Sequence, residues 1–123
     1  MKLTASEFEK LVEDGLTLIP EEIRSRISNV QLVIENEPSD DLLDELGVPP
    51  DETLFGLYTG VPLTERTAEY SALPDRIIIF RHPLLEEFDN PLDIRREVAR
   101  TVIHEVAHHF GIDEDRLAEL GWE

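Results

Sequence analysis

The sequence contains no cysteine, and this absence limits the chemistry open to it. A chain without cysteine forms no disulfide framework and no thiolate metal site, so any bound zinc must use nitrogen and oxygen ligands. The chain also lacks a run of roughly 20 apolar residues, the length that a membrane-spanning helix needs. Residues 1–3 lead directly into a helix-capping box at Thr4 and Glu7, not into the apolar segment of a signal peptide. We therefore expect a cytoplasmic protein.

Basic residues are scarce as well. The chain has 11 lysines and arginines against 28 acidic residues, which gives a formal net charge of −17. Such a charge repels polyphosphates and anionic lipid surfaces, so nucleic acids and membranes are disfavoured as partners. A neutral or basic peptide would be tolerated or attracted. The more modest interpretation is that the charge only improves solubility.

The length of 123 residues and the hydrophobic fraction of 41% indicate one folded domain over residues 1–123, without internal repeats. Helical spacing after the Thr4 cap predicts a first helix, and Pro20 opens a second, short one. Ser39 is expected to cap another short helix. Branched apolar residues predict strands at 30–34, 54–58 and 76–80, the last of them central in the sheet. Loops are expected at 63–75 and around His82, Pro83 and Phe88.

The C-terminal third contains the strongest helix signal. Asn90 is a good N-cap, Pro91 suits the first turn, and Gly111 suits a left-handed C-cap, so a helix is predicted over 91–110. Asp113 is expected to cap a last short helix, after which Trp122 folds back onto the core. The order of elements predicts an α+β fold, with a small sheet packed against the long helix.

Two histidines of the long helix share one of its faces. At about 100° per residue, His104 and His108 lie about 40° apart around the axis. They point away from the apolar stripe of the helix, whose members are Ala99, Val102, Ile103, Val106 and Phe110. Two imidazoles one turn apart are the arrangement that a tetrahedral zinc requires of two ligands.

Glu105 lies between these histidines and is too far round the helix to be the natural third ligand. Its carboxylate can instead act as general base toward a water on the metal. After the break at Gly111 come three consecutive acids, Asp113, Glu114 and Asp115, any of which can supply the third ligand. Glu114 has the offset expected for the last ligand of the pattern H-E-x-x-H-x-x-G-x-x-E, whereas Asp113 has a competing use as a helix cap.

The complete pattern is specific. A chance match to its histidines, glutamate, glycine and final acid has a probability of roughly 2 in 10,000 in a chain of this composition. The competing interpretation is a solvated helix face that happens to carry two histidines. The predicted helix, its polar face and the glycine break all favour the metal site.

The segment from His104 to Leu117 resembles the small bacterial zincin-like metallopeptidases. Residues 56–63 and 74–77 are similar to that family too, so the resemblance covers about the C-terminal half. It implies a minimal zincin fold, with a mixed sheet beside the active-site helix. It also implies zinc held by His104, His108 and an acid after Gly111. The resemblance does not supply a substrate.

Other polar residues near the motif have more ordinary interpretations. His109 is expected to be a packed or hydrogen-bonded structural histidine, and His82 has no defined partner. Tyr58 and Tyr70 could polarise a carbonyl, but packing within the sheet and a place on a loop account for them as well. Glu97 is expected to be a solvated charge.

These features predict a zinc metallopeptidase that acts on a peptide or protein substrate. Zinc is held by His104, His108 and Glu114, and Glu105 takes the proton of the attacking water. The strand near 54–58 is expected to present its edge to an extended peptide. The alternative is a metal-binding or protein-interaction module that keeps the zincin site without cleaving peptides. Glu105 favours the enzyme, because metal binding alone needs no base.

Overall fold

The computed structural model describes residues 2–60 and 75–122, whose three strands form one mixed sheet. β1 (Val30–Glu35) runs parallel to β3 (Asp75–Phe80), and β2 (Gly56–Thr59) runs antiparallel to β3 on its other side. The order β1-β3-β2 makes β3 the central strand, as its continuous apolar run predicts. β2 begins two residues later than the strand predicted at 54–58.

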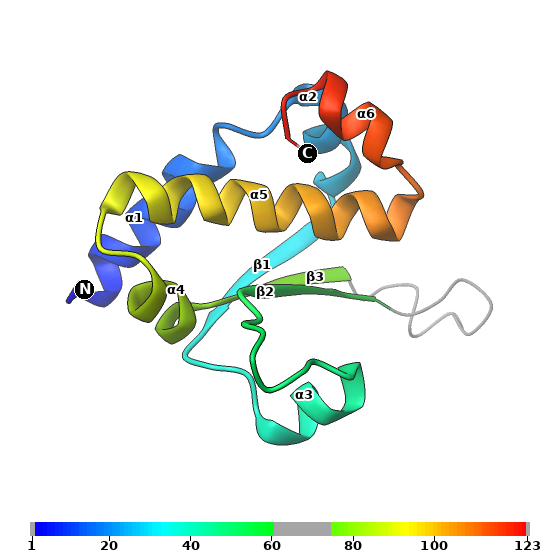
Figure 1. Ribbon diagram of the computed structural model, residues 1–123. Helices are drawn as coiled ribbons and strands as arrows, with labels where there is room; N and C mark the ends of the chain where they lie inside the picture. Colours follow the sequence, from blue (N-terminus) through cyan, green and yellow to red (C-terminus); the bar gives the residue numbers. More distant parts are fainter. Residues whose placement is uncertain (1, 61–74, 123) are drawn as a thin grey trace.

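Helices lie on both sides of this sheet. Figure 1 shows the long helix α5 across one side of the strands and the short helix α3 on the opposite side. The element contacts place α1 against α5 and α5 against β2. The described helices are α1 (Ala5–Leu16), α2 (Glu21–Arg24), the 3-10 turn η1 (Ser25–Ile27), α3 (Asp40–Leu46), α4 (Arg81–Glu87), α5 (Pro91–Phe110) and α6 (Glu114–Glu119).

The helix ends follow the capping residues predicted from the sequence. Thr4 and Glu7 form a reciprocal capping box at α1, and the Ser39 side chain accepts a hydrogen bond at the start of α3. α5 begins after Asn90, which caps it, and ends at Gly111 with φ of 72°. A left-handed residue ends a helix at little cost only when it has no Cβ, so glycine suits this position.

One predicted loop is a helix. The prediction of a loop around His82, Pro83 and Phe88 is wrong, because residues 81–87 form α4. Pro83 is the third residue of α4, within the first turn, where a missing N–H breaks no intrahelical hydrogen bond. Leu84 and Leu85 of α4 are buried in the core. The loop predicted at 63–75 lies outside the described residues except for Asp75, which begins β3.

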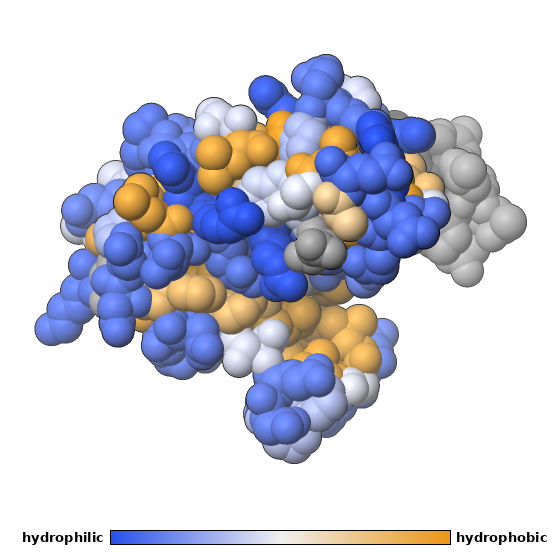
Figure 2. Space-filling model, turned by 45° about the horizontal axis from the view of Figure 1, so that its top comes forward, coloured by the Kyte–Doolittle hydropathy of each residue, from blue (hydrophilic) through white to orange (hydrophobic). Residues whose placement is uncertain are grey.

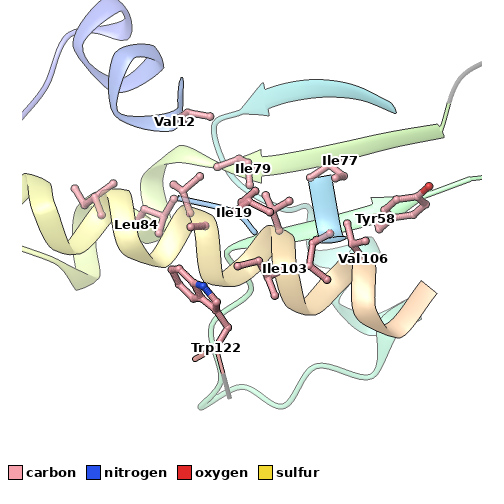
Figure 3. Close-up of a cluster of buried hydrophobic side chains, with 14 of the residues drawn as sticks. Val12, Ile19, Tyr58, Ile77, Ile79, Leu84, Ile103, Val106 and Trp122 are labelled. Atoms are coloured by element: carbon pink, nitrogen blue, oxygen red, sulfur yellow. The ribbon is translucent and has the colours of Figure 1, made fainter. Parts of the chain in front are cut away.

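The core lies between the sheet and α5. Figure 3 shows Ile77 and Ile79 of β3 beside Ile103 and Val106 of α5, all at most 2% exposed. Trp122 packs into the same core cluster, so the predicted return of the C-terminal residues is confirmed.

Phe110 departs from the predicted apolar stripe of α5. Its side chain is 38% exposed, not buried, although the other members of the stripe are fully buried. The guanidinium of Arg26 lies 5.7 Å from the centre of its ring. The last turn of α5 therefore extends past the core, and its apolar residue meets a cation and solvent instead.

The visible surface of the molecule is mainly polar. Figure 2 shows one face of the molecule, which is mostly hydrophilic and carries separate hydrophobic patches. Among the helices formed by residues 2–60 and 75–122, none is both long and apolar enough to cross a bilayer.

β2 approaches α5 very closely at Gly56. A Cβ atom built on Gly56 would lie 2.7 Å from Cγ2 of Thr101 and 2.9 Å from the carbonyl oxygen of Ile78. The strand can therefore reach this position beside α5 only because residue 56 has no side chain. This contact fixes the distance between the sheet edge and the polar face of the helix.

We predict that Gly56→Ala destabilises the protein by about 1–3 kcal/mol, the usual cost of overpacking a tight contact. Chemical denaturation of the variant and the wild type measures the difference. Thr101→Ser removes Cγ2, so the pair Gly56→Ala with Thr101→Ser should recover part of the loss. A Gly56→Ala variant as stable as the wild type would contradict the close packing described here.

Candidate metal and catalytic site

A cleft of about 270 Å³ lies between the polar face of α5 and the segment that leads into β2. Both predicted histidine ligands and the predicted base line this cleft. Its lining residues are Thr53, Leu54, Phe55, Gly56, Glu97, Arg100, Thr101, His104, Glu105 and His108. The structure therefore brings together His104, Glu105 and His108, as their spacing on the helix predicts.

The His104 ring is held from outside the cleft by the C-terminal part of the chain. Its Nε2 atom lies 2.9 Å from the carbonyl oxygen of Trp122. A carbonyl oxygen can only accept, so Nε2 carries the hydrogen of this bond. A backbone carbonyl that fixes the tautomer and orientation of a histidine in this way is common around metal sites.

Glu105 is half-buried in the cleft. Burial raises the pKa of this carboxyl above its usual value, while a hydrogen bond from the backbone N–H of Tyr58 and the nearby His108 oppose the rise. The bond from Tyr58 orients the carboxylate from the side of the sheet. A carboxylate with a raised pKa is a better proton acceptor, which is the property a general base needs.

The sheet edge that meets Glu105 is the outer edge of β2. The Phe55 carbonyl accepts a hydrogen bond from the Phe80 N–H at 2.9 Å, so Phe55 and the alternate residues after it face β3. The backbone groups of Gly56 and Tyr58 point the other way, toward the side of Glu105. This alternation explains why Tyr58, and not Leu57, contributes the N–H.

Glu97 differs from its expected role as a solvated charge. Its side chain is only 16% exposed and lines the cleft two turns before His104, with Arg100 at 3.8 Å. Burial raises the pKa of Glu97, and the charges of Arg100 and His104 oppose this effect. The cleft is thus lined by two carboxyl groups, those of Glu97 and Glu105.

The predicted third ligand does not join the histidines. Gly111 turns the chain as expected, and the Asp113 side chain accepts a hydrogen bond from the Arg116 N–H at 2.9 Å, which caps α6. Glu114 then lies exposed in the first turn of α6. Arg116 also binds the carboxylates of Glu22 and Glu119, which raise the pKa of its guanidinium and fix α6 against α2.

In the part of the chain that the structure describes, no three His, Cys, Asp or Glu residues are grouped closely enough to hold a metal. The residues of the cleft supply only part of a zinc site: His104 and His108 are two ligands, and Glu105 is the base. A third ligand has to be supplied from outside this group of residues. The assignment of that ligand to Glu114 stays a prediction.

Several residues near the site carry no signal in the sequence. The carbonyl of Trp122 and the N–H of Tyr58 are backbone groups, which no side-chain motif reveals. Asp75, at the start of β3, accepts a hydrogen bond from the Tyr58 hydroxyl at 2.6 Å.

His109 stacks on the Tyr58 ring, so it packs as expected although its side chain is 42% exposed. Tyr70 lies outside the described residues.

Comparisons with known proteins identify the family and the fold of the chain. The sequence profile of a family described as zincin-like metallopeptidases matches residues 27–122. A solved structure of a conserved hypothetical protein from Thermus thermophilus is similar in fold, with a TM-score of 0.58 and 23% sequence identity. The similarity covers 94% of this chain and 98% of that one. No curated protein sequence matches the chain.

We predict that Glu114 contributes more to zinc affinity than either of its acidic neighbours, Asp113 and Asp115. Alanine variants at Asp113, Glu114 and Asp115 are matched controls for one another, and the largest loss should fall at Glu114. The measurement is zinc titration of each folded variant. An unchanged affinity in Glu114→Ala, together with a large loss in either neighbour, would refute the assignment and leave the two histidines as ligands.

Proposed function

Because the chain belongs to the family of zincin-like metallopeptidases, we propose that it hydrolyses peptide bonds with Glu105 as general base. One observation carries this proposal. His104, Glu105 and His108 line the same cleft, and burial raises the pKa of the glutamate that lies between the two histidines. A site that only stored a metal would have no use for a base at this position.

His104 and His108 would hold the zinc, with Glu114 as the proposed third ligand. When bound, zinc supplies a Lewis acid that lowers the pKa of water to about 7 and polarises a carbonyl. The metal needs one position open to solvent, and the cleft provides that access.

The protein's own residues perform the proton transfers. Glu105 accepts a proton from the water as the water oxygen forms its bond to the peptide carbonyl carbon. The same carboxyl then donates this proton to the amine nitrogen as the carbon–nitrogen bond breaks. The Tyr58 N–H holds the carboxylate in place through both steps. The products are one carboxylic acid and one amine.

The outer edge of β2 is our candidate for substrate binding. An extended peptide can add to an exposed strand through main-chain hydrogen bonds, and its side chains then occupy alternate pockets. The backbone groups of Gly56 point toward this edge, and Leu54 and Phe55 provide apolar contacts along the cleft. The net charge of −17 favours neutral or basic peptides.

A second candidate is a metal-binding module without peptidase activity. The absence of a third ligand beside the histidines, among the described residues, favours it. The presence of Glu105 in the same cleft favours the peptidase. Hydrolysis by the wild type and its loss in a Glu105 variant separate the two.

We predict that Glu105→Gln keeps zinc and loses at least about 100-fold in hydrolytic rate, because glutamine preserves the shape but cannot accept the proton. The assay is cleavage of a pool of denatured proteins, followed by mass spectrometry. Glu45→Gln makes the same change on the exposed surface of α3 and should cleave like the wild type. Equal rates for Glu105→Gln and the wild type would remove Glu105 from the chemistry.

A further inference from the structure

Three side chains meet outside the cleft, where β2, β3 and the end of α5 come together. The Tyr58 hydroxyl donates a hydrogen bond of 2.6 Å to Oδ2 of Asp75. The rings of Tyr58 and His109 are stacked, with centroids 4.1 Å apart and planes inclined by 27°. Nε2 of His109 lies 3.9 Å from the same Asp75 oxygen. We call Tyr58, Asp75 and His109 the edge cluster.

The residue opposite Asp75 leaves room for its carboxylate. The pairing of Thr59 with Arg76 places Gly60 across from Asp75. A Cβ atom on Gly60 would lie 2.5 Å from Oδ1 and 2.8 Å from Cγ of Asp75. Since no side chain occupies this position, the Asp75 carboxylate lies over Gly60 and reaches the Tyr58 hydroxyl.

Tyr58 connects the edge cluster to the catalytic cleft. Its side chain is 9% exposed, and Figure 3 shows it next to Val106 at one end of the core, with the hydroxyl directed outward. At the other end of the residue, the backbone N–H binds the Glu105 carboxylate. The orientation of one residue therefore determines where the base is held.

We propose that Asp75 is a positioning residue, which holds Tyr58 through its hydroxyl so that the Tyr58 N–H stays directed at Glu105. The kinetic consequence rests on the proposed peptidase function, whereas the structural consequence does not. Asp75 is not among the residues that line the cleft, so the effect proposed here reaches Glu105 through Tyr58.

β2 needs such an anchor because it is short and lies at the edge of the sheet. It has four residues, and among the strands of residues 2–60 and 75–122 it pairs with β3 alone. The ladder fixes the backbone groups that face β3, but those that face outward depend on the twist of the strand. A side-chain contact from Asp75 in β3 and a ring contact from His109 in α5 limit that twist.

A purely structural role for Asp75 makes a different prediction. Loss of general stability would increase amide exchange along the whole of β2, whereas loss of positioning would act on the outward-facing N–H of Tyr58. Exchange of the Tyr58 amide, compared with the Leu57 and Thr59 amides that face β3, separates these cases. This measurement needs neither metal nor substrate.

The experiment compares Tyr58→Phe, Asp75→Ala and Asp75→Asn with the wild type by amide hydrogen exchange and by kinetics. Tyr58→Phe keeps the stacked ring and loses only the hydroxyl, and Asp75→Asn keeps an acceptor of the same shape. We expect Tyr58 amide exchange to rise about 5- to 10-fold in Tyr58→Phe and Asp75→Ala, the equivalent of one hydrogen bond. The amides of Leu57 and Thr59 should stay protected, and Asp75→Asn should lie closer to the wild type.

In the same variants, kcat should fall about 5- to 10-fold while KM changes little, because the base is displaced and the binding edge is kept. Leu57→Ala is the matched control, since it shortens a side chain on the opposite face of the same strand. An unchanged Tyr58 amide in Asp75→Ala and Tyr58→Phe, or an equal rise at all three amides, would overturn the proposal. A wild type that binds zinc but cleaves nothing would overturn the proposed function, and the exchange data would still decide the role of Asp75.

Discussion

The position of α5 relative to the sheet controls the candidate site. One face of this helix is fully buried, with Ala99, Val102, Ile103 and Val106 at 0% exposure. Because the helix cannot rotate without exposing these residues, the directions of His104, Glu105 and His108 are fixed by core packing. The close approach of Gly56 to Thr101 then sets how near the outer edge of β2 comes to these polar residues.

Features encoded by neighbouring residues could be predicted from the sequence. α5 has the predicted bounds because Asn90, Pro91 and Gly111 are local signals that act within one helical turn. The apolar run of residues 76–80 predicts the central place of β3 in the sheet. The sequence does not predict α4, because Pro83 suggests a loop although proline is well tolerated in a first helical turn. The helical spacing of apolar residues places Phe110 on the buried face of α5. This spacing does not show that the core ends before the last turn of the helix, where Phe110 is partly exposed.

In the candidate site too, features encoded by neighbouring residues can be predicted, whereas contacts between distant segments cannot. His104, Glu105 and His108 lie on one helix, so their spacing determines their common face. The third ligand depends instead on the path of the chain after Gly111, which the Asp113 cap and the ion pairs of Arg116 direct toward α2. Tyr58 and Asp75 are 17 residues apart and meet only because β2 and β3 pair. A spacing rule within one helix cannot reveal such contacts.

Zinc titration of the purified protein measures whether His104 and His108 together bind one zinc per chain. We expect about one zinc per chain, bound by the wild type and lost in both His104→Ala and His108→Ala, with the helical circular dichroism signal retained. A folded variant of either histidine that still binds zinc in full would contradict it.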